Sequence, residues 1–172
     1  LEKVRRTLEE NNIEVRGGAI PCTVYGDKPK MFYGGDVFFG YTACATGEKT
    51  LAGTLRAVNS AAESFDYILL DDLFQFGGFV TCYCKRCVSI FNRKYGTSYR
   101  RLNIARKVLR EAEWMGRWTA FHQEVMNDLA MKIVEAAKDV NPRVRVVQKL
   151  FPCYDFYPEY GLDLGTLAKI YD

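Results

Sequence analysis

The sequence contains a single histidine, His122, among its 172 residues. A metal site built on several histidines is therefore excluded, and any catalytic site that needs an imidazole must use this one ring. No apolar stretch approaches the roughly 18 residues of a membrane-spanning helix, so we expect no membrane partner. The chain also lacks a large excess of charge of one sign. The 24 Lys and Arg residues nearly balance 21 Asp and Glu, and a formal net charge of +3 does not indicate a nucleic-acid partner.

What the chain does contain is typical of a globular domain, with 48% hydrophobic and 26% charged residues. Apolar periodicity predicts helices over residues 1–12, 48–64, 85–95, 100–110, 113–140 and 164–171. Shorter apolar runs predict strands over residues 13–20, 67–70 and 144–150, the second of them buried on both faces. Because strands alternate with helices, the sequence predicts a single α/β unit with a parallel sheet over residues 1–172.

Three predicted loops leave the carboxyl ends of these strands, over residues 22–47, 71–81 and 151–160. In parallel α/β folds, ligands bind at the carboxyl ends of the strands. We therefore expect the functional residues to lie in these loops.

The second of these loops ends in a C-x-C-x-x-C pattern formed by Cys82, Cys84 and Cys87. Three thiols this close in sequence can wrap one metal ion, and a closed structural zinc site needs four tetrahedral ligands. We favour Cys22 as the fourth ligand, because its strand is expected to lie beside the 67–70 strand. The other candidates are Cys44 and Cys153. A disulfide, or unrelated buried thiols, are the alternatives to a zinc site.

Asp71 and Asp72 follow the predicted 67–70 strand directly. Charges at such a position are costly unless they are solvated, paired or used in the site. Adjacent strand residues point to opposite faces, so one of the two carboxyls should face a central pocket, where it can act as a general acid. A helix-capping or loop-stabilising role, or a metal-ligand role, is the alternative.

The predicted strand over residues 144–150 carries Lys149 near its end, and an aromatic loop with acidic residues follows it. Aromatic faces beside carboxylates suit a carbohydrate pocket, because sugars present apolar C–H faces and hydroxyl groups together. The alternative is an aromatic cluster that only packs under the loop. His122 lies near the apolar stripe of the longest helix, and we expect it in the core or at its boundary.

The segment 67–74, the cysteine pattern, Phe91 and Gly96 together resemble part of a glycoside hydrolase TIM barrel, most closely the zinc-containing β-galactosidase type. In that type the fourth strand ends in the acid/base carboxylate, and a C-x-C-x-x-C cluster shortly after it joins an upstream cysteine on zinc. The segment 141–162 also resembles uncharacterised barrel proteins assigned to the glycoside hydrolases. The resemblance covers roughly residues 13–172 and implies a section of a TIM (β/α)8 barrel.

The resemblance implies a role for each candidate residue. Asp72 would be the general acid/base, with Asp71 orienting it. The sugar pocket would be lined by Lys149, Tyr154, Tyr157 and Glu159. A structural zinc ion would be held by Cys22, Cys82, Cys84 and Cys87. The implied substrate is a carbohydrate whose O-glycosyl bond is hydrolysed.

Two departures from the family pattern bear on this interpretation. The usual Asn-Glu pair is Asp71-Asp72 here, and the nucleophile of a later strand has no counterpart. Asp155 or Glu159 could supply the second carboxyl, but we expect this chain to be the middle of a barrel that needs further barrel segments or an oligomer partner. A non-catalytic carbohydrate- or protein-binding domain stabilised by zinc is the alternative function. The compartment, cytoplasmic or secreted, stays open.

Overall fold

The computed structural model describes residues 2–12, 17–19, 44–70, 82–150 and 161–172. Three short strands in this part of the chain form one sheet: β1 (Gly17–Ala19), β2 (Tyr67–Leu70) and β3 (Arg145–Gln148). The strands are parallel and lie in the order β1-β2-β3, with Ile68 opposite Gly17 on one side and Val146 on the other. The predicted α/β class with a parallel sheet is confirmed.

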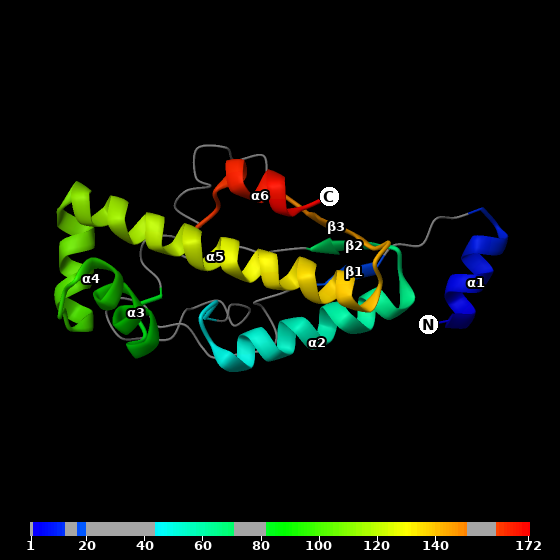
Figure 1. The fold of residues 1–172 in the computed structure, drawn as a ribbon, viewed down its shortest axis with the longest axis horizontal. Helices are drawn as coiled ribbons and strands as arrows, with labels where there is room; N and C mark the ends of the chain where they lie inside the picture. Colours follow the sequence, from blue (N-terminus) through cyan, green and yellow to red (C-terminus); the bar gives the residue numbers. More distant parts are fainter. Residues whose placement is uncertain (1, 13–16, 20–43, 71–81, 151–160) are drawn as a thin grey trace.

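Six helices accompany the sheet in the described residues (Figure 1): α1 (Glu2–Glu10), α2 (Glu48–Ser64), α3 (Lys85–Tyr95), α4 (Arg101–Arg110), α5 (Ala112–Val140) and α6 (Leu164–Ile170). The bounds of α2, α3 and β2 are those predicted. The helix α3 ends where the sequence indicates, because Gly96 adopts a left-handed conformation with a φ of 63° that glycine tolerates at a helix end. None of the helices described has an apolar stretch long enough to cross a membrane.

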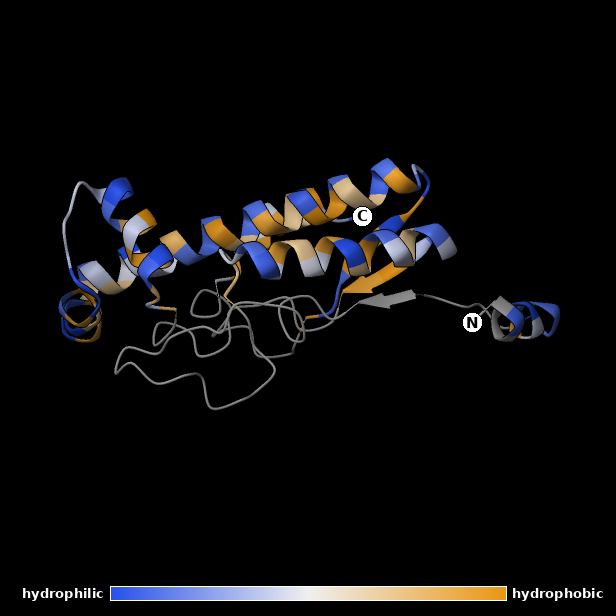
Figure 2. Ribbon diagram, turned by 90° about the horizontal axis from the view of Figure 1, so that it is seen from below, coloured by the Kyte–Doolittle hydropathy of each residue, from blue (hydrophilic) through white to orange (hydrophobic). Residues whose placement is uncertain are grey.

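A first core lies between the sheet and the helices α2, α5 and α6. Ile68 and Leu70 of β2 and Val146 of β3 are fully buried in it, together with Ile133 and Ala137 of α5. The other face of β2 is more open, because Leu69 is 37% exposed. The predicted burial of this strand on both faces is therefore not found. Helices cover only one face of the sheet in the described residues (Figure 2).

A second core lies beyond the carboxyl ends of the strands, among α3, α4 and the first half of α5 (Figure 1). Its centre is aromatic. The ring of Trp118 lies 4.4 Å from that of Tyr83 and nearly parallel to it, and 4.8 Å from that of Phe91. We call α3, α4 and the first half of α5 the helical extension. Because α5 contributes residues to both cores, it joins this helical extension to the sheet.

After α6 the backbone returns to β3. The N–H of Asp172 donates to the carbonyl of Val146 at 3.0 Å, and the N–H of Val146 donates to the Asp172 carboxylate, also at 3.0 Å. These bonds hold Asp172 beside β3, on the opposite side from β2.

Candidate functional site

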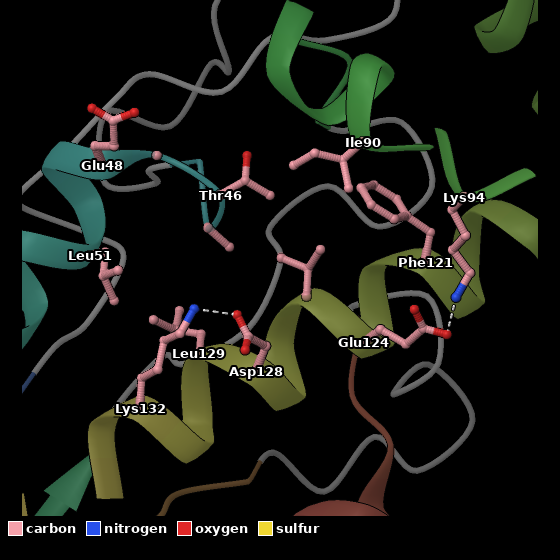
Figure 3. Close-up of a pocket in the computed structure, with 13 residues that line it drawn as sticks. Thr46, Glu48, Leu51, Ile90, Lys94, Phe121, Glu124, Asp128, Leu129 and Lys132 are labelled. Carbon is pink, nitrogen blue, oxygen red and sulfur yellow. Dashed lines mark hydrogen bonds and ion pairs between the residues drawn. The ribbon is translucent and has the colours of Figure 1, made fainter. Parts of the chain in front are cut away.

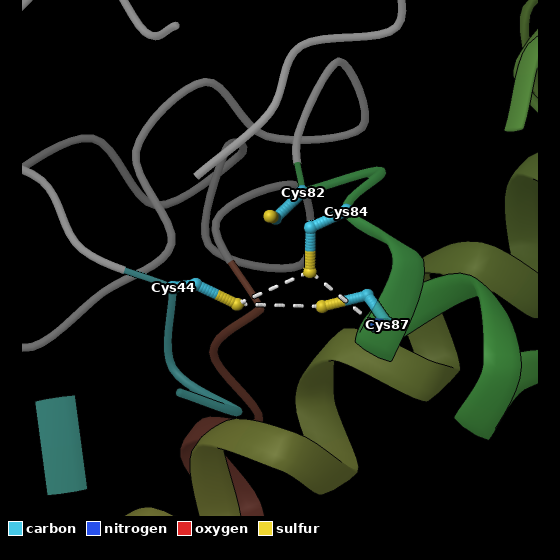
Figure 4. A group of neighbouring side chains, drawn as sticks. All are labelled: Cys44, Cys82, Cys84 and Cys87. Carbon is cyan, nitrogen blue, oxygen red and sulfur yellow. Dashed lines mark hydrogen bonds between the residues drawn. The ribbon is translucent and has the colours of Figure 1, made fainter. Parts of the chain in front are cut away.

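Four cysteines come together where the helices α2 and α3 begin (Figure 4). Cys44 lies four residues before the first residue of α2, and Cys84 is the N-cap of α3. Each helix follows one of two neighbouring parallel strands, β1 and β2. Because the carboxyl ends of parallel strands share one edge of the sheet, the connections that leave them can meet. The fold therefore brings Cys44 to the C-x-C-x-x-C pattern.

The four sulfur atoms of Cys44, Cys82, Cys84 and Cys87 all lie within 4.8 Å of one another. The Sγ of Cys44 is 3.7 Å from that of Cys84 and 3.5 Å from that of Cys87. These separations are too long for a disulfide bond, and all four cysteines are free. They agree with the edge of a zinc–thiolate tetrahedron, about 3.8 Å for zinc–sulfur bonds of about 2.3 Å.

Hydrogen bonds position the sulfur atoms. The hydroxyl of Thr46 lies 3.2 Å from the sulfur of Cys44 and 3.2 Å from that of Cys87. The N–H of Cys87 donates to the sulfur of Cys84 at 3.4 Å. Arg86 ties the two segments together, because its guanidinium donates to the Thr46 carbonyl and to Glu48, each at 3.0 Å. The cluster is thus braced from both helices.

The pKa values of the four thiols are shifted in different directions. Hydrogen bonds from Cys44, Cys82 and Cys87 lower the pKa of the Cys84 thiol, because they stabilise its thiolate. Hydrogen bonding to the Cys44 sulfur raises the pKa of Cys87 and of Cys82, with burial adding to the effect. A divalent cation at the centre favours the thiolate form of all its ligands.

This arrangement can hold one metal ion. Thiolate ligands in a tetrahedron suit zinc or iron, and four protein ligands leave no open position for a water molecule. Three of the four thiols are buried and Cys84 is half-buried, so the protein would shield most of such a site from solvent. The chemistry available to it is structural: it fastens the segment before α2 to the start of α3.

His122 is buried in the second, aromatic core. Its ring centroid is 5.1 Å from that of Trp118 and 5.3 Å from that of Phe121. Burial lowers the pKa of His122 to about 3, so the imidazole is neutral at physiological pH. Its expected place in the core is confirmed.

A cavity of about 360 Å³ lies beside the cluster, between the start of α2, α3 and the middle of α5 (Figure 3). Leu51, Ile90 and Phe121 give it an apolar wall. The charged residues at its rim are paired: Lys94 with Glu124, Lys132 with Asp128, and Glu48 with Arg86 outside the cavity. The cavity therefore offers a ligand mainly apolar surface.

Only some of the predicted site residues lie in the part of the chain that the structure describes. Cys82, Cys84 and Cys87 are together, as predicted, and their fourth neighbour in the described residues is Cys44. Cys22, the favoured ligand, lies outside the described residues, and so do Asp71, Asp72, Tyr154, Tyr157 and Glu159. Lys149 is described and exposed, and its N–H donates to the Leu70 carbonyl at 2.9 Å. Lys149 therefore lies beside Leu70, the last residue of β2. Asp71 is the next residue in the sequence after Leu70.

The place of Thr46 and Arg86 in the site was not predicted from the sequence, in which Thr46 was considered only as a possible helix cap. A weak signal for Cys44 and Thr46 was present, because both lie within four residues of the predicted helix start at residue 48, whereas Cys84 directly precedes the next one. Helix N-termini stabilise thiolates through the helix dipole. No comparable pattern marks Arg86, since its partners lie about 40 positions away in the sequence.

Comparison with known proteins adds two findings. A family model described as "Probable glycosyl hydrolase, catalytic domain" matches residues 1–172. The chain is also 27% identical over 165 residues to an uncharacterised protein of Saccharolobus solfataricus. That alignment covers 95% of this chain and 26% of the relative, so the chain spans about a quarter of the relative's length.

Proposed function

Because this chain belongs to the family of probable glycosyl hydrolase catalytic domains, we propose that it forms part of a catalytic domain that hydrolyses O-glycosyl bonds of carbohydrates. The match of the family model over residues 1–172 is the observation that carries the proposal. A parallel sheet whose carboxyl edge is followed by long connections is a scaffold suited to this chemistry.

In this proposal the sheet is a section of a TIM (β/α)8 barrel. Three observations support it: the strands are parallel, their spatial order is their order in the chain, and helices pack on one face. The open face around Leu69 would then point to the barrel interior. The bonds between Asp172 and Val146 place backbone where the next strand would pair with β3.

Asp72 is the proposed general acid/base, oriented by Asp71. Both directly follow Leu70, the last residue of β2, and the carboxyl ends of barrel strands are where catalytic residues lie. Lys149, beside the end of β2, would contact the sugar together with Tyr154, Tyr157 and Glu159. The second carboxyl that glycoside hydrolysis requires would come from Asp155, Glu159 or another barrel segment.

Zinc is the proposed metal of the four-cysteine cluster, with Cys44, Cys82, Cys84 and Cys87 as ligands. The sulfur separations and the closed, half-buried to buried donor set support it. When bound, the ion would supply structural cross-linking only. Its effect would be to fix the position at which the connection after Asp72 enters α3.

Activity of an Asp72→Asn variant of the complete protein tests the proposal. We expect its rate on alkyl glycosides to fall by about 100-fold or more, because a proton must reach the leaving oxygen. Dinitrophenyl glycosides, whose leaving group needs no proton, should be affected less. Asp66→Asn is the matched control, since Asp66 is exposed and directly precedes Tyr67, the first residue of β2, at the opposite end of the strand. Full activity of Asp72→Asn would refute the role, and a wild-type protein inactive on all glycosides would refute the function.

A non-catalytic carbohydrate-binding domain is the second candidate. It is favoured by the Asp71-Asp72 pair, in which the shorter Asp side chain stands where the glycoside hydrolases that the sequence resembles have Glu. Calorimetry that shows oligosaccharide binding without turnover would support it over the enzyme.

A further inference from the structure

Basic residues are concentrated in one part of this nearly neutral chain. Between residues 73 and 110 there are nine Lys and Arg and no Asp or Glu, although the whole chain has 24 basic and 21 acidic residues. This stretch includes all of α3 and α4. A strong local positive charge therefore lies on a molecule whose overall charge is small.

A groove of about 830 Å³ is lined by residues of α3, of its start and of the connection to α4. Four cationic side chains line it, and no acidic residue does: Lys85, Arg93, Arg100 and Arg101. Ser89 and Thr97 add hydroxyl groups to its wall. A second hollow of about 550 Å³ shares Lys85, Ser89 and Arg93 and likewise has no acidic lining residue. The residues Lys85, Ser89 and Arg93, spaced one helical turn apart, thus form a ridge between two basic hollows.

Among the described residues no carboxylate pairs with the cations of this groove, although the Cys84 sulfur also lines it. Neighbouring cations have acidic partners, since Arg86 pairs with Glu48, Lys94 with Glu124 and Lys107 with Glu111. Lys85, Arg93, Arg100 and Arg101 form no such pair with any described residue. Unpaired guanidinium groups that share a groove suit carboxylates or other oxyanions, which they can bind in a bidentate manner.

The groove lies at the end of the molecule where a substrate is expected. The helix α3 starts directly after the four-cysteine cluster, and α3 and α4 lie beyond the carboxyl ends of the strands (Figure 1). A chain-like ligand held at those strand ends can extend along α3. The groove is thus placed to contact parts of a substrate remote from the bond that reacts.

We propose that this basic groove binds the acidic groups of an anionic polysaccharide, so that the substrate class is glycans that carry carboxylates such as uronates. The identification of the ligand as a glycan rests on the proposed function. Binding of the acidic groups rests on Arg93, Arg100, Arg101 and Lys85. A nucleic acid is the competing ligand for the same cations, and the test below includes one.

Calorimetry on the full-length protein tests the proposal with an oligogalacturonate hexamer and its carboxyl-reduced, neutral counterpart. The groove variant is Arg93→Gln/Arg101→Gln. The matched control is Arg106→Gln/Arg110→Gln, which removes the same charge from exposed positions of α4 outside the groove. We expect the acidic hexamer to bind about tenfold more tightly than the neutral one, and the groove variant to lose about that factor. The control should change the affinity by less than about twofold.

Equal binding of the two hexamers, or an equal loss in the groove and control variants, would overturn the proposal. So would a single-stranded DNA oligonucleotide that binds more tightly than the acidic hexamer through Arg93 and Arg101. Hydrolysis of neutral aryl glycosides by the same protein reports separately on the proposed function. If hydrolysis occurs without groove binding, only the present inference fails. If the acidic hexamer binds in the groove without hydrolysis, the groove stands and the proposed enzyme activity fails.

Discussion

The sulfur atoms of Cys44 and Cys87 lie 3.5 Å apart, although 43 positions separate the two residues in the sequence. The hydroxyl of Thr46 is 3.2 Å from both sulfur atoms. The contact joins the segment before α2 to the first turn of α3. It therefore links the connections that follow two neighbouring strands of the sheet.

Replacing Cys44 by serine should abolish binding of the proposed metal and lower the melting temperature by several degrees. A hydroxyl is a poor substitute for a thiolate ligand, and the binding energy of a structural metal contributes to folding. Elemental analysis and calorimetric melting of the variant measure both effects. Cys153→Ser is the control and should keep the metal. Loss of the metal in Cys22→Ser but not in Cys44→Ser would identify Cys22 as the ligand instead.

Asp163 should stabilise the start of α6. Its carboxylate accepts hydrogen bonds from the N–H and the hydroxyl of Thr166, and these bonds lower the pKa of Asp163. Asp163→Ala should cost about 1 kcal/mol in urea denaturation at neutral pH, whereas Asp163→Asn should cost much less because it keeps an N-cap acceptor.

The pH dependence of this contribution follows from the lowered pKa. The stabilisation is complete above the pKa of Asp163 in the unfolded chain and is lost as the pH falls through its pKa in the folded protein. The difference in unfolding free energy between wild type and Asp163→Ala should therefore shrink in acid. A difference that stays constant down to low pH would contradict the assigned charge.

His122 should remain neutral in the folded protein between pH 5 and pH 8. Its pKa is about 3 because the ring is buried, whereas in the unfolded chain it takes up a proton near pH 6.5. Between these two values the unfolded state binds the extra proton. Burial of His122 therefore makes the free energy of unfolding rise with pH by about 1.4 kcal/mol per unit in that window, and the contribution levels off above it.

Carbon-detected NMR of ¹³C-labelled histidine measures this directly. The His122 resonance, assigned by its loss in His122→Gln, should not shift between pH 5 and pH 8. A titration near pH 6.5 would show that water reaches the ring and that the aromatic core is open.

Phe91 should be critical for the helical extension. It is fully buried, and its ring contacts those of Tyr95, Trp118 and Phe121. Phe91→Ala should cost about 3–5 kcal/mol in urea denaturation, because it leaves a cavity in a packed aromatic cluster. The exposed Leu102 provides the control, since Leu102→Ala should change stability by less than about 0.5 kcal/mol. Similar costs for the two variants would contradict the packing described.

The elements were largely predictable because their signals are local. Periodicity gave the bounds of α2 and α3, and the apolar run 67–70 gave β2. Parallel pairing followed from the alternation of strands and helices. The exposure of Leu69 was not predictable, since a continuous apolar run does not reveal how much of the second face is covered.

The site was predictable only in part. Three ligands share one short pattern, so Cys82, Cys84 and Cys87 could be grouped from spacing alone. The choice among Cys22, Cys44 and Cys153 depends on the paths of the connections after β1 and after β3, which spacing does not determine. The bracing by Thr46 and Arg86 is likewise a tertiary property, because it forms only once the two helix starts meet.

The most direct test of the four-cysteine metal centre is the metal content of the purified protein, with a count of reactive thiols before and after chelation. The predicted result is about one zinc ion per chain and four thiols that become reactive only when the chelator removes it. Protein without metal, with these cysteines oxidised in pairs, would contradict the metal centre.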